Sequence, residues 1–271
     1  MTHRRTPTIM KHAILLIALA VLVHACATSP MGRSQLILFP EAEMAQMGAA
    51  AFQDIEQKTP VSTASGVNAY VSCVAENILR AMPDGNPGAW EIKVFEQDAA
   101  NAFALPGRKI GVYTGLLDVA ENQDQLATVI GHEVAHVLAQ HSNERVSTNF
   151  VTQSGLQLAQ IAVGADTAMK QQLFGLLGLG AQVGVILPFS RAQEAEADLV
   201  GLELMAKAGF DPRESVKLWQ NMQAQGGDSP PEFLSTHPSS ERRITELNDR
   251  MRKYMPISLE ARSAGRVPDC R

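Results

Sequence analysis

Apolar residues three or four positions apart mark two segments in the first third of the chain, residues 41–57 and 67–82. Side chains at this spacing share one face of an α-helix and can be buried together. Pro60 and Pro83 follow the two segments, at positions where a helix is expected to end. The pattern therefore predicts two amphipathic helices.

The pattern then changes from helical spacing to alternation. Residues 90–95 and 109–113 alternate, and residues 101–105 form a short extended run that ends before Pro106. Alternation places successive side chains on opposite faces of a β-strand. Three short strands so close together in the sequence predict a small antiparallel sheet.

Helical spacing returns after this region and continues to the end of the chain. Asn122 is a candidate N-cap with Gln125 three residues on, and it precedes a helix with an apolar face. Further helices are predicted over residues 143–162, 191–207 and 240–254, and from Pro212 onward. The elements together predict an α+β fold that is mostly helical.

Residues 173–189 form the most apolar stretch outside the first 25 residues. Four glycines interrupt this stretch, and its length is at the lower limit for a membrane span. We therefore expect a buried or lid-forming helical hairpin beside the functional site. An element that dips into a membrane is the alternative.

The first 25 residues have the features of a signal peptide, with a basic start and an apolar core over residues 13–23. They end in Val23-His24-Ala25-Cys26, which is similar to a bacterial lipobox, so Cys26 is expected to carry a lipid. An ordinary signal peptide followed by a coincidental cysteine is the alternative. Residues 26–35 would then be a lipid-anchored linker, and residues 36–271 would form the functional domain.

Net charge and cysteine content limit which partners and which cellular compartment are expected for the protein. The formal net charge of −5 would become about −8 without residues 1–25, so nucleic acid is an unfavourable partner. The lipobox implies the periplasm, and Ala27 lacks the aspartate associated with inner-membrane retention, which favours the inner face of the outer membrane. In that oxidising compartment Cys73 and Cys270 are expected to form a disulfide, with two free thiols as the alternative.

Residues 132–136 read His-Glu-Val-Ala-His and carry the candidate chemistry. His132 and His136 lie one helical turn apart on one face, so both can bind the same metal ion. Glu133 lies about 100° round the helix, on the flank of that face. This is the arrangement of a zinc hydrolase, but hydrolytic zinc takes three protein ligands and a water. A third ligand is therefore required.

Residues 190–198, with the sequence SRAQEAEAD, supply a candidate third ligand. Glu194 and Asp198 are four residues apart and share a helix face, whereas Glu196 points about 200° away from Glu194. We expect Glu194 to ligate the metal and Asp198 to accept the spare N–H of a ligand histidine, assigned to His132. A solvated acidic helix face is the alternative.

These ligands define a hydrolytic mechanism with one Zn²⁺ per chain. The ion would lower the pKa of a bound water to about 7 and polarise the scissile carbonyl. Glu133 would take the proton of the water as general base and pass it to the leaving amine.

These residues together resemble the HtpX and CAAX-prenyl-protease family of zinc metallopeptidases, which are gluzincins. The similarity is greatest to its periplasmic lipoprotein branch of BepA-like and LoiP-like proteins. The matching pieces are residues 101–107, 113–117, 132–136, 190–198, 236–238 and 243–244. The chain is expected to differ from the integral-membrane members by lacking flanking transmembrane helices. It is also expected to differ from BepA-like proteins by ending at Arg271 without a helical-repeat domain.

The resemblance implies a zincin-like metallopeptidase domain with the sheet beside the metal-binding helix. It implies an endopeptidase for misfolded or misassembled envelope proteins, with outer-membrane assembly machinery as a further partner. A zinc-bound chaperone or assembly factor for outer-membrane proteins, with slow or self-inhibited proteolysis, is the alternative from another class.

The resemblance also indicates two further catalytic candidates. His237, in a His-Pro pair, and Arg243, six residues on, would donate to the transition-state oxyanion, with Arg242 ranked lower. His237 could instead be a structural histidine, or it could move onto the open zinc position and exclude water. His141 is out of phase with His132, so we expect a surface or second-layer contact for it and not ligation.

Residues 101–105 could offer an open sheet edge on which an extended peptide lies as an added strand. Asn101 or Ala102, together with Ala104, would then contact the substrate through main-chain groups. An ordinary interior strand is the alternative.

Overall fold

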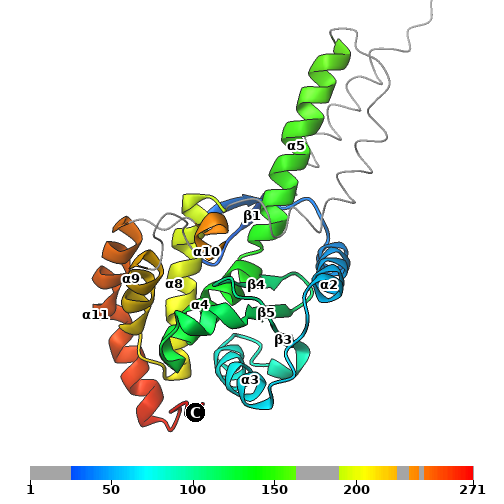
Figure 1. Cartoon of the computed structure of the whole chain (residues 1–271). Helices are drawn as coiled ribbons and strands as arrows, with labels where there is room; N and C mark the ends of the chain where they lie inside the picture. The colour runs from blue at the N-terminus through cyan, green and yellow to red at the C-terminus, as the bar shows by residue number, and fades with distance from the viewer. Residues whose placement is uncertain (1–25, 163–188, 225–231, 238–240, 271) are drawn as a thin grey trace, which may run out of the picture.

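The structure is a computed structural model that describes residues 26–162, 189–224, 232–237 and 241–270. Most of these residues are helical, which confirms the predicted α+β, mostly helical class (Figure 1). The helices are α2 (Glu41–Lys58), α3 (Ser65–Arg80), α4 (Gln123–Leu138), α5 (His141–Ala162), α8 (Arg191–Ala208), α9 (Glu214–Ala224), α10 (Glu232–Thr236) and α11 (Glu241–Ser263), with short 3-10 turns at Pro87–Ala89 and Thr114–Asp118.

The main sheet has three strands, β3 (Glu91–Phe95), β4 (Ala102–Leu105) and β5 (Lys109–Tyr113), in the order β3-β5-β4. The predicted antiparallel pairing is right for β4 and β5 but wrong for β3 and β5, which are parallel. Short loops make the three strands run in alternating directions. Because β5 lies in the middle, β3 and β5 become neighbours with the same direction, and β4 is left at the edge.

The two faces of this sheet are covered by different helices. One face, with Ile110 and Val112, joins the main core with residues of α3 and α4. The other face forms an aromatic cluster with α2, whose members are Phe52, Phe95, Phe103 and Tyr113. The sheet is therefore enclosed between helices, and only its β4 edge faces toward the side of α4 where the candidate metal residues lie.

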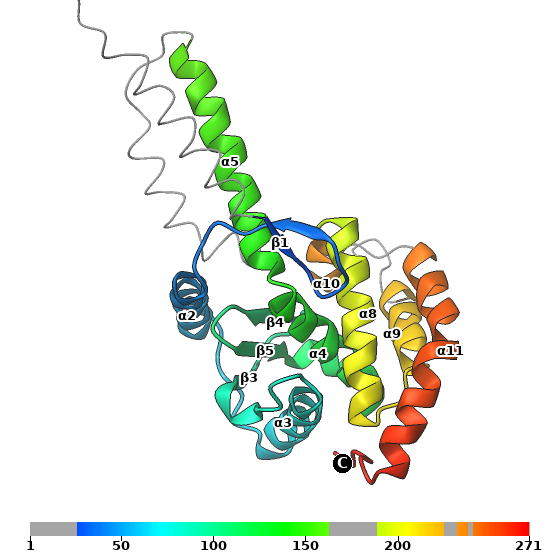
Figure 2. The ribbon, with the colours of Figure 1, turned by 180° about the vertical axis from the view of Figure 1, so that it is seen from behind.

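Helix α4 lies at the centre of the molecule and packs against α3, α8, α9 and β4 (Figures 1 and 2). Asn122 caps it, since its side chain accepts hydrogen bonds from Asp124 N and Gln125 N at 3.0 Å each. Its closest neighbour is α8, which crosses it at Gly131 and Gly201. A Cβ on Gly201 would lie 2.8 Å from the backbone of Gly131 and His132, so the two helices can approach this closely only without side chains there.

The C-terminal helices differ from the prediction in one respect. Helix α11 was expected to end at Tyr254 but continues through Pro256 to Ser263. Burial offsets the cost of the internal proline, because Ser258 and Ala261 lie in the interior and the Ser258 hydroxyl donates to Phe210 O at 2.7 Å. After α11 the tail returns to α3, where Cys270 forms a disulfide with Cys73.

Residues 26–35, expected as a linker, fold instead as the start of a β-hairpin. Strands β1 (Cys26–Thr28) and β2 (Ser34–Leu36) pair antiparallel. The hairpin lies over the junction of α4 and α5 and beside α8 (Figure 2). Gln35 Nε2 donates to Ala139 O at 2.6 Å, which fixes the hairpin to the end of α4. Local alternation in so short a segment is too weak a signal to predict this hairpin.

None of the helices within the described residues is long and apolar enough to cross a membrane. The predicted signal peptide, residues 1–25, and nearly all of the apolar stretch at 173–189 lie outside the described residues.

The crossing of α4 and α8 makes a testable prediction. Gly201→Ala should lower the free energy of unfolding by about 1–3 kcal/mol, because the new methyl group forces the two backbones apart. Urea unfolding of the metal-free protein measures this loss. Gly66→Ala in α3 is the matched control, since a Cβ there meets nothing within 4 Å and should leave stability equal or slightly higher. Equal effects of the two substitutions would contradict the close approach.

Candidate metal centre

Helix α4 presents His132, Glu133 and His136 to the interior. Helical spacing places both imidazoles on one face, with ring centroids 4.7 Å apart. All three side chains are buried, with His136 only 1% exposed. Buried imidazoles need polar partners, so the groups that surround them decide what this face of the helix can bind.

Helix α8 brings Glu194 onto the two histidines. Its first turn is fixed by a capping box in which Ser190 and Gln193 exchange hydrogen bonds. One Glu194 oxygen lies 3.4 Å from His136 Nε2, and the other lies 3.5 Å from His132 Nε2. The close crossing of α4 and α8 gives Glu194 this reach.

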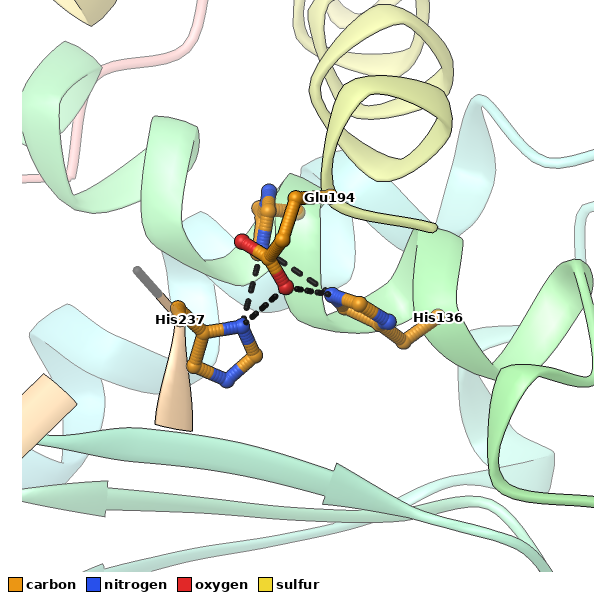
Figure 3. Close-up of side chains that lie close together, drawn as sticks. His136, Glu194 and His237 are labelled. Atoms are coloured by element: carbon orange, nitrogen blue, oxygen red, sulfur yellow. Dashed lines mark hydrogen bonds and ion pairs between the residues drawn. The ribbon is translucent and has the colours of Figure 1, made fainter. Parts of the chain in front are cut away.

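His237 completes a cluster of four donor groups. It follows α10, and its Nδ1 lies 3.0 Å from Glu194 Oε1 and 3.2 Å from His132 Nε2. Figure 3 shows the Glu194 carboxylate between the rings of His136 and His237. The four ligand atoms lie within 4.8 Å of one another.

The donor chemistry of this cluster fits zinc. Ligand atoms about 2.0–2.1 Å from a tetrahedral ion are separated by roughly 3.3 Å, close to the 3.0–3.5 Å spacings here. The outer nitrogens of both α4 histidines are already engaged, because Asp198 Oδ1 lies 3.0 Å from His132 Nδ1 and His141 Nδ1 lies 2.9 Å from His136 Nδ1. Both Nε2 lone pairs can therefore point into the cluster.

The sequence predicted that Asp198 would contact a ligand histidine and that His141 would make a surface or second-layer contact without binding the metal. Asp198 contacts the histidine with which it was paired, His132. His141 is fully buried and contacts His136 from behind, so it is a second-layer residue and not a surface one.

Arg243 has a different environment from that expected of an oxyanion donor. Its guanidinium donates to Glu194 Oε2 at 2.7 Å and to both oxygens of Asp198 at 2.7 Å. The Cζ atom also lies 3.9 Å from the centre of the Trp219 ring. These contacts hold the two carboxylates in position, which is the role that the geometry supports. Arg242 points outward and pairs with Glu246, with 84% of its side chain exposed.

The charges of the cluster are set by burial and by these partners. Burial lowers the pKa of His136 well below its usual value, so its ring is neutral and able to ligate a metal. Burial also lowers the pKa of His132, but the hydrogen bonds that its ring donates to Asp198 and Glu194 outweigh burial and raise the pKa to about 9 in the metal-free protein. Burial raises the pKa of Asp198, while Arg243 and His132 lower it by more, so Asp198 stays ionised.

Glu133 lies between the cluster and the edge of the sheet. Its Oε2 accepts a hydrogen bond from Ala104 N at 3.1 Å, and its Oε1 lies 3.3 Å from His237 Nε2. Burial raises its pKa above the usual carboxyl range, although His237 and His132 oppose the shift. A carboxylate with a raised pKa beside a metal site is suited to accept a proton.

Strand β4 lies at an edge of the sheet next to Glu133, with no further strand paired to it among the described residues. Asn101 O accepts from Tyr113 N at 3.0 Å, so by alternation Ala102 and Ala104 direct their main-chain groups away from β5. Of the two alternatives Asn101 and Ala102, the Asn101 carbonyl is used by β5, so Ala102 is the residue whose main-chain groups face outward. The side chain of Asn101 is different: Nδ2 donates to Glu232, and the buried Oδ1 has no hydrogen-bond partner among the described residues.

Aromatic side chains cover the cluster. Phe189 lies over His136 with ring centroids 3.8 Å apart, and Phe233 stacks on His237 at 4.4 Å. Phe189 N donates to Thr236 O at 3.1 Å, and Phe233 N donates to Ala100 O at 3.2 Å. Phe189 and helix α10 are therefore joined over the site, and α10 is hydrogen-bonded to Ala100, just before β4.

The sequence reasoning did not assign the partners of His141, the aromatic cover or the structural role of Arg243. The sequence contained two signals: His141 lies five residues after the ligand His136, and Phe189 lies just before the helix that carries Glu194. Neither could be interpreted without knowing which segments lie together in the fold. Glu196 was expected to point away from Glu194, and it contacts His141 instead, with a 3.2 Å separation.

Comparison with known proteins identifies similar sequences. The family model of Peptidase family M48 matches residues 65–251. The mitochondrial metalloendopeptidase OMA1 of Schizosaccharomyces pombe is 35% identical over 203 residues, 74% of this chain and 56% of that protein. The OMA1 protein of Saccharomyces cerevisiae is 39% identical over 180 residues, 63% of this chain and 48% of that protein. The β-barrel assembly-enhancing protease of Escherichia coli K12 is 29% identical over 175 residues, 62% of this chain and 36% of that protein. The matched region thus spans about half of each fungal relative and less of the bacterial one.

The environment of Arg243 predicts a large effect of its removal. Arg243→Met should destabilise the metal-free protein by about 3–5 kcal/mol, because it removes the guanidinium that donates to the buried carboxylates of Glu194 and Asp198. Urea unfolding measures the loss. The neighbouring Arg242→Met is the control and should change stability by about 0.5 kcal/mol or less, since its ion pair is exposed. Comparable effects at both positions would show that the buried pairs do not support the site.

Proposed function

The chain belongs to Peptidase family M48, and from this membership we propose that it is a zinc-dependent endopeptidase that cleaves misfolded or misassembled envelope proteins in the bacterial periplasm. The observation that carries the proposal is the buried cluster of His132, His136 and Glu194, with Glu133 on its flank. The family, the cluster and the metalloendopeptidase names of the relatives all agree with peptide-bond hydrolysis.

Zn²⁺ is the cofactor, and His132, His136 and Glu194 are the proposed ligands. When bound, the ion supplies a water of lowered pKa and polarises the substrate carbonyl. Two neutral imidazoles and one carboxylate would leave the site with a charge of about +1, which favours hydroxide without holding it too tightly. Asp198 orients His132, and Arg243 holds Asp198 and Glu194 in place.

Glu133 is the proposed general base. Its raised pKa favours acceptance of a proton from the attacking water, and the same carboxyl group can then deliver the proton to the leaving amine. The hydrogen bond from Ala104 N keeps one oxygen fixed. The other oxygen, which faces His237, is the one that can move a proton once that histidine withdraws.

The β4 edge is the proposed binding surface for an extended peptide. Ala102 offers its main-chain N–H and carbonyl on this edge, and Ala104 offers its carbonyl, since its N–H is bonded to Glu133. Asn101 offers its side-chain oxygen, which has no hydrogen-bond partner in the described part of the chain. A strand added to the edge would cross the face of α4 that carries Glu133. Backbone recognition of this kind suits substrates of varied sequence, because it needs unpaired backbone groups and not a fixed motif.

The cellular setting is proposed from the sequence start and from one relative. A lipid on Cys26 would anchor the domain to a membrane, with the inner face of the outer membrane as the favoured location. The bacterial relative is named for β-barrel assembly, which supports a link to outer-membrane assembly machinery. The OMA1 relatives are mitochondrial, so the family works in more than one compartment.

His237 supports a second candidate, a zinc-bound chaperone or assembly factor whose proteolysis is self-inhibited. In the described arrangement His237 Nδ1 belongs to the ligand cluster, while His237 Nε2 lies against Glu133. One side chain would therefore exclude the substrate water and engage the base at the same time. Helix α10 would also hinder a substrate, because Phe233 N donates a hydrogen bond to Ala100 O, next to the β4 edge.

Replacement of the base tests the enzymatic proposal. Glu133→Gln should lower cleavage of unfolded casein by about 10²-fold or more, while zinc content stays at one ion per chain. A chelator should abolish the wild-type cleavage, and added Zn²⁺ should restore it. Glu246→Gln, an exposed carboxylate on α11, is the matched control and should retain full activity.

The cellular readout separates the two candidates. If Glu133→Gln keeps its zinc, loses casein cleavage and fails to replace the wild-type protein in cells, proteolysis is the function. Full complementation by the same variant would favour the chaperone and overturn the proposed role of cleavage.

Removal of His237 tests the self-inhibited state. His237→Ala should raise the rate of cleavage of a short unstructured peptide by about tenfold, as expected when a contact worth about 1.4 kcal/mol no longer favours the blocked form. The neighbouring Thr236→Ala should leave the rate unchanged. A fall in rate would assign His237 to the transition state instead, and an unchanged rate would deny it any role in the site.

A further inference from the structure

A second layer of buried polar groups lies behind His136, on the side away from the metal cluster. His136 Nδ1 lies 2.9 Å from His141 Nδ1, and His141 Nε2 lies 3.2 Å from Glu196 Oε2. His141 is fully buried and the Glu196 side chain is 3% exposed, so neither group is solvated. Neither residue has a place in the hydrolytic reaction as derived above.

The contacts of this layer permit one arrangement of protons when His136 Nε2 ligates a metal. The His136 proton must then be on Nδ1, where it is donated to His141 Nδ1. The His141 proton must in turn be on Nε2, where it is donated to the Glu196 carboxylate. A chain of two imidazoles that ends on a carboxylate therefore fixes the tautomer of His136, as Asp198 does directly for His132.

Glu196 is held in place by the N-terminal hairpin. Met31 N donates to its Oε1 at 3.0 Å, and Arg33 Nε donates to its Oε2 at 3.1 Å. The Arg33 guanidinium also donates to Glu144 Oε2 at 2.6 Å, at the start of α5. The turn between β1 and β2 thus contacts both α5 and α8 at Glu196, the last group of the hydrogen-bonded series that runs from His136 through His141.

The second layer is also braced from the other side. Glu144 accepts from Gln193 Nε2 at 2.8 Å, which ties the first turn of α8 to α5. Gln35 Nε2 donates to both Ala139 O and Glu144 Oε2. Glu196 is therefore positioned by three elements, α5, α8 and the hairpin, each of which limits its movement.

We propose that Arg33, Glu196 and His141 are positioning residues that set the tautomer and the orientation of His136, so that the hairpin of residues 26–36 is part of the metal centre. The inference rests on the proposed zinc peptidase function. Helix α8 then supplies one ligand, Glu194, and a carboxylate behind each histidine of α4. The proposed lipid on Cys26 would lie at the start of the same hairpin.

Zinc affinity tests the proposal without any measurement of cleavage. Glu196→Leu in the full chain should weaken zinc binding by about 10–100-fold in competition with a chromogenic chelator. It should also shift the visible absorption of the Co²⁺-substituted protein, which reports on the ligand geometry. Glu196→Gln keeps an acceptor for His141 and should bring the affinity back to within about threefold of wild type. Arg33→Met, which leaves the buried groups in place, should give an intermediate loss.

Glu203→Leu, on the outer side of the same helix as Glu196, is the matched control for a general effect on α8. Glu203 pairs with Lys207 one turn on and has no part in the second layer, so its replacement should leave zinc affinity and the Co²⁺ spectrum near wild type. If Glu196→Leu does not fold, the Arg33→Met result decides the question. Wild-type zinc affinity and spectrum in both Glu196→Leu and Arg33→Met would overturn the inference and leave the peptidase proposal intact. A wild-type protein that binds no zinc would overturn the proposed function and this inference together.

Discussion

The close crossing of α4 and α8 at Gly131 and Gly201 is the contact on which the rest of the structure depends. Glycine at both positions allows the two backbones to meet, since a Cβ on either residue would lie 3.0 Å or less from backbone atoms of the other helix. Only at this distance can a carboxylate on α8 reach two imidazoles on α4. Without the crossing, the same residues would be two separate amphipathic helices with no common site.

Burial of so many charged groups imposes a second constraint. Isolated buried charges are costly, and pairing offsets the cost only where each group has a well-placed partner. Here Arg243 faces both Glu194 and Asp198, while the histidines of α4 face these carboxylates in turn. The network keeps Glu194 and Asp198 ionised inside the protein, which is the state required to hold a metal ion and to orient its ligands.

The covered state of the site connects structure to control of activity. His237, Phe189 and Phe233 lie over the cluster, and hydrogen bonds join their segments to each other and to the residue before β4. Glu133 is only 3% exposed beneath this cover, so the proposed attack on a bound peptide requires the cover to move. Closure of this kind would keep folded neighbours away from an open hydrolytic site.

The sequence alone determined the features that depend on local spacing. His132, Glu133 and His136 share a helix by the 3.6-residue period, and Glu194 and Asp198 share another, so their relative directions could be read without a structure. The helices and the three strands could be predicted from the same kind of periodicity. The Cys73–Cys270 disulfide could be predicted from the oxidising compartment that the sequence start suggests.

Tertiary structure alone decided the other features, because they depend on which distant segments lie next to one another. It placed β5 between β3 and β4, turned Arg243 toward two carboxylates, brought His237 into the cluster, and folded residues 26–36 onto Glu196, 160 or more residues farther along the chain.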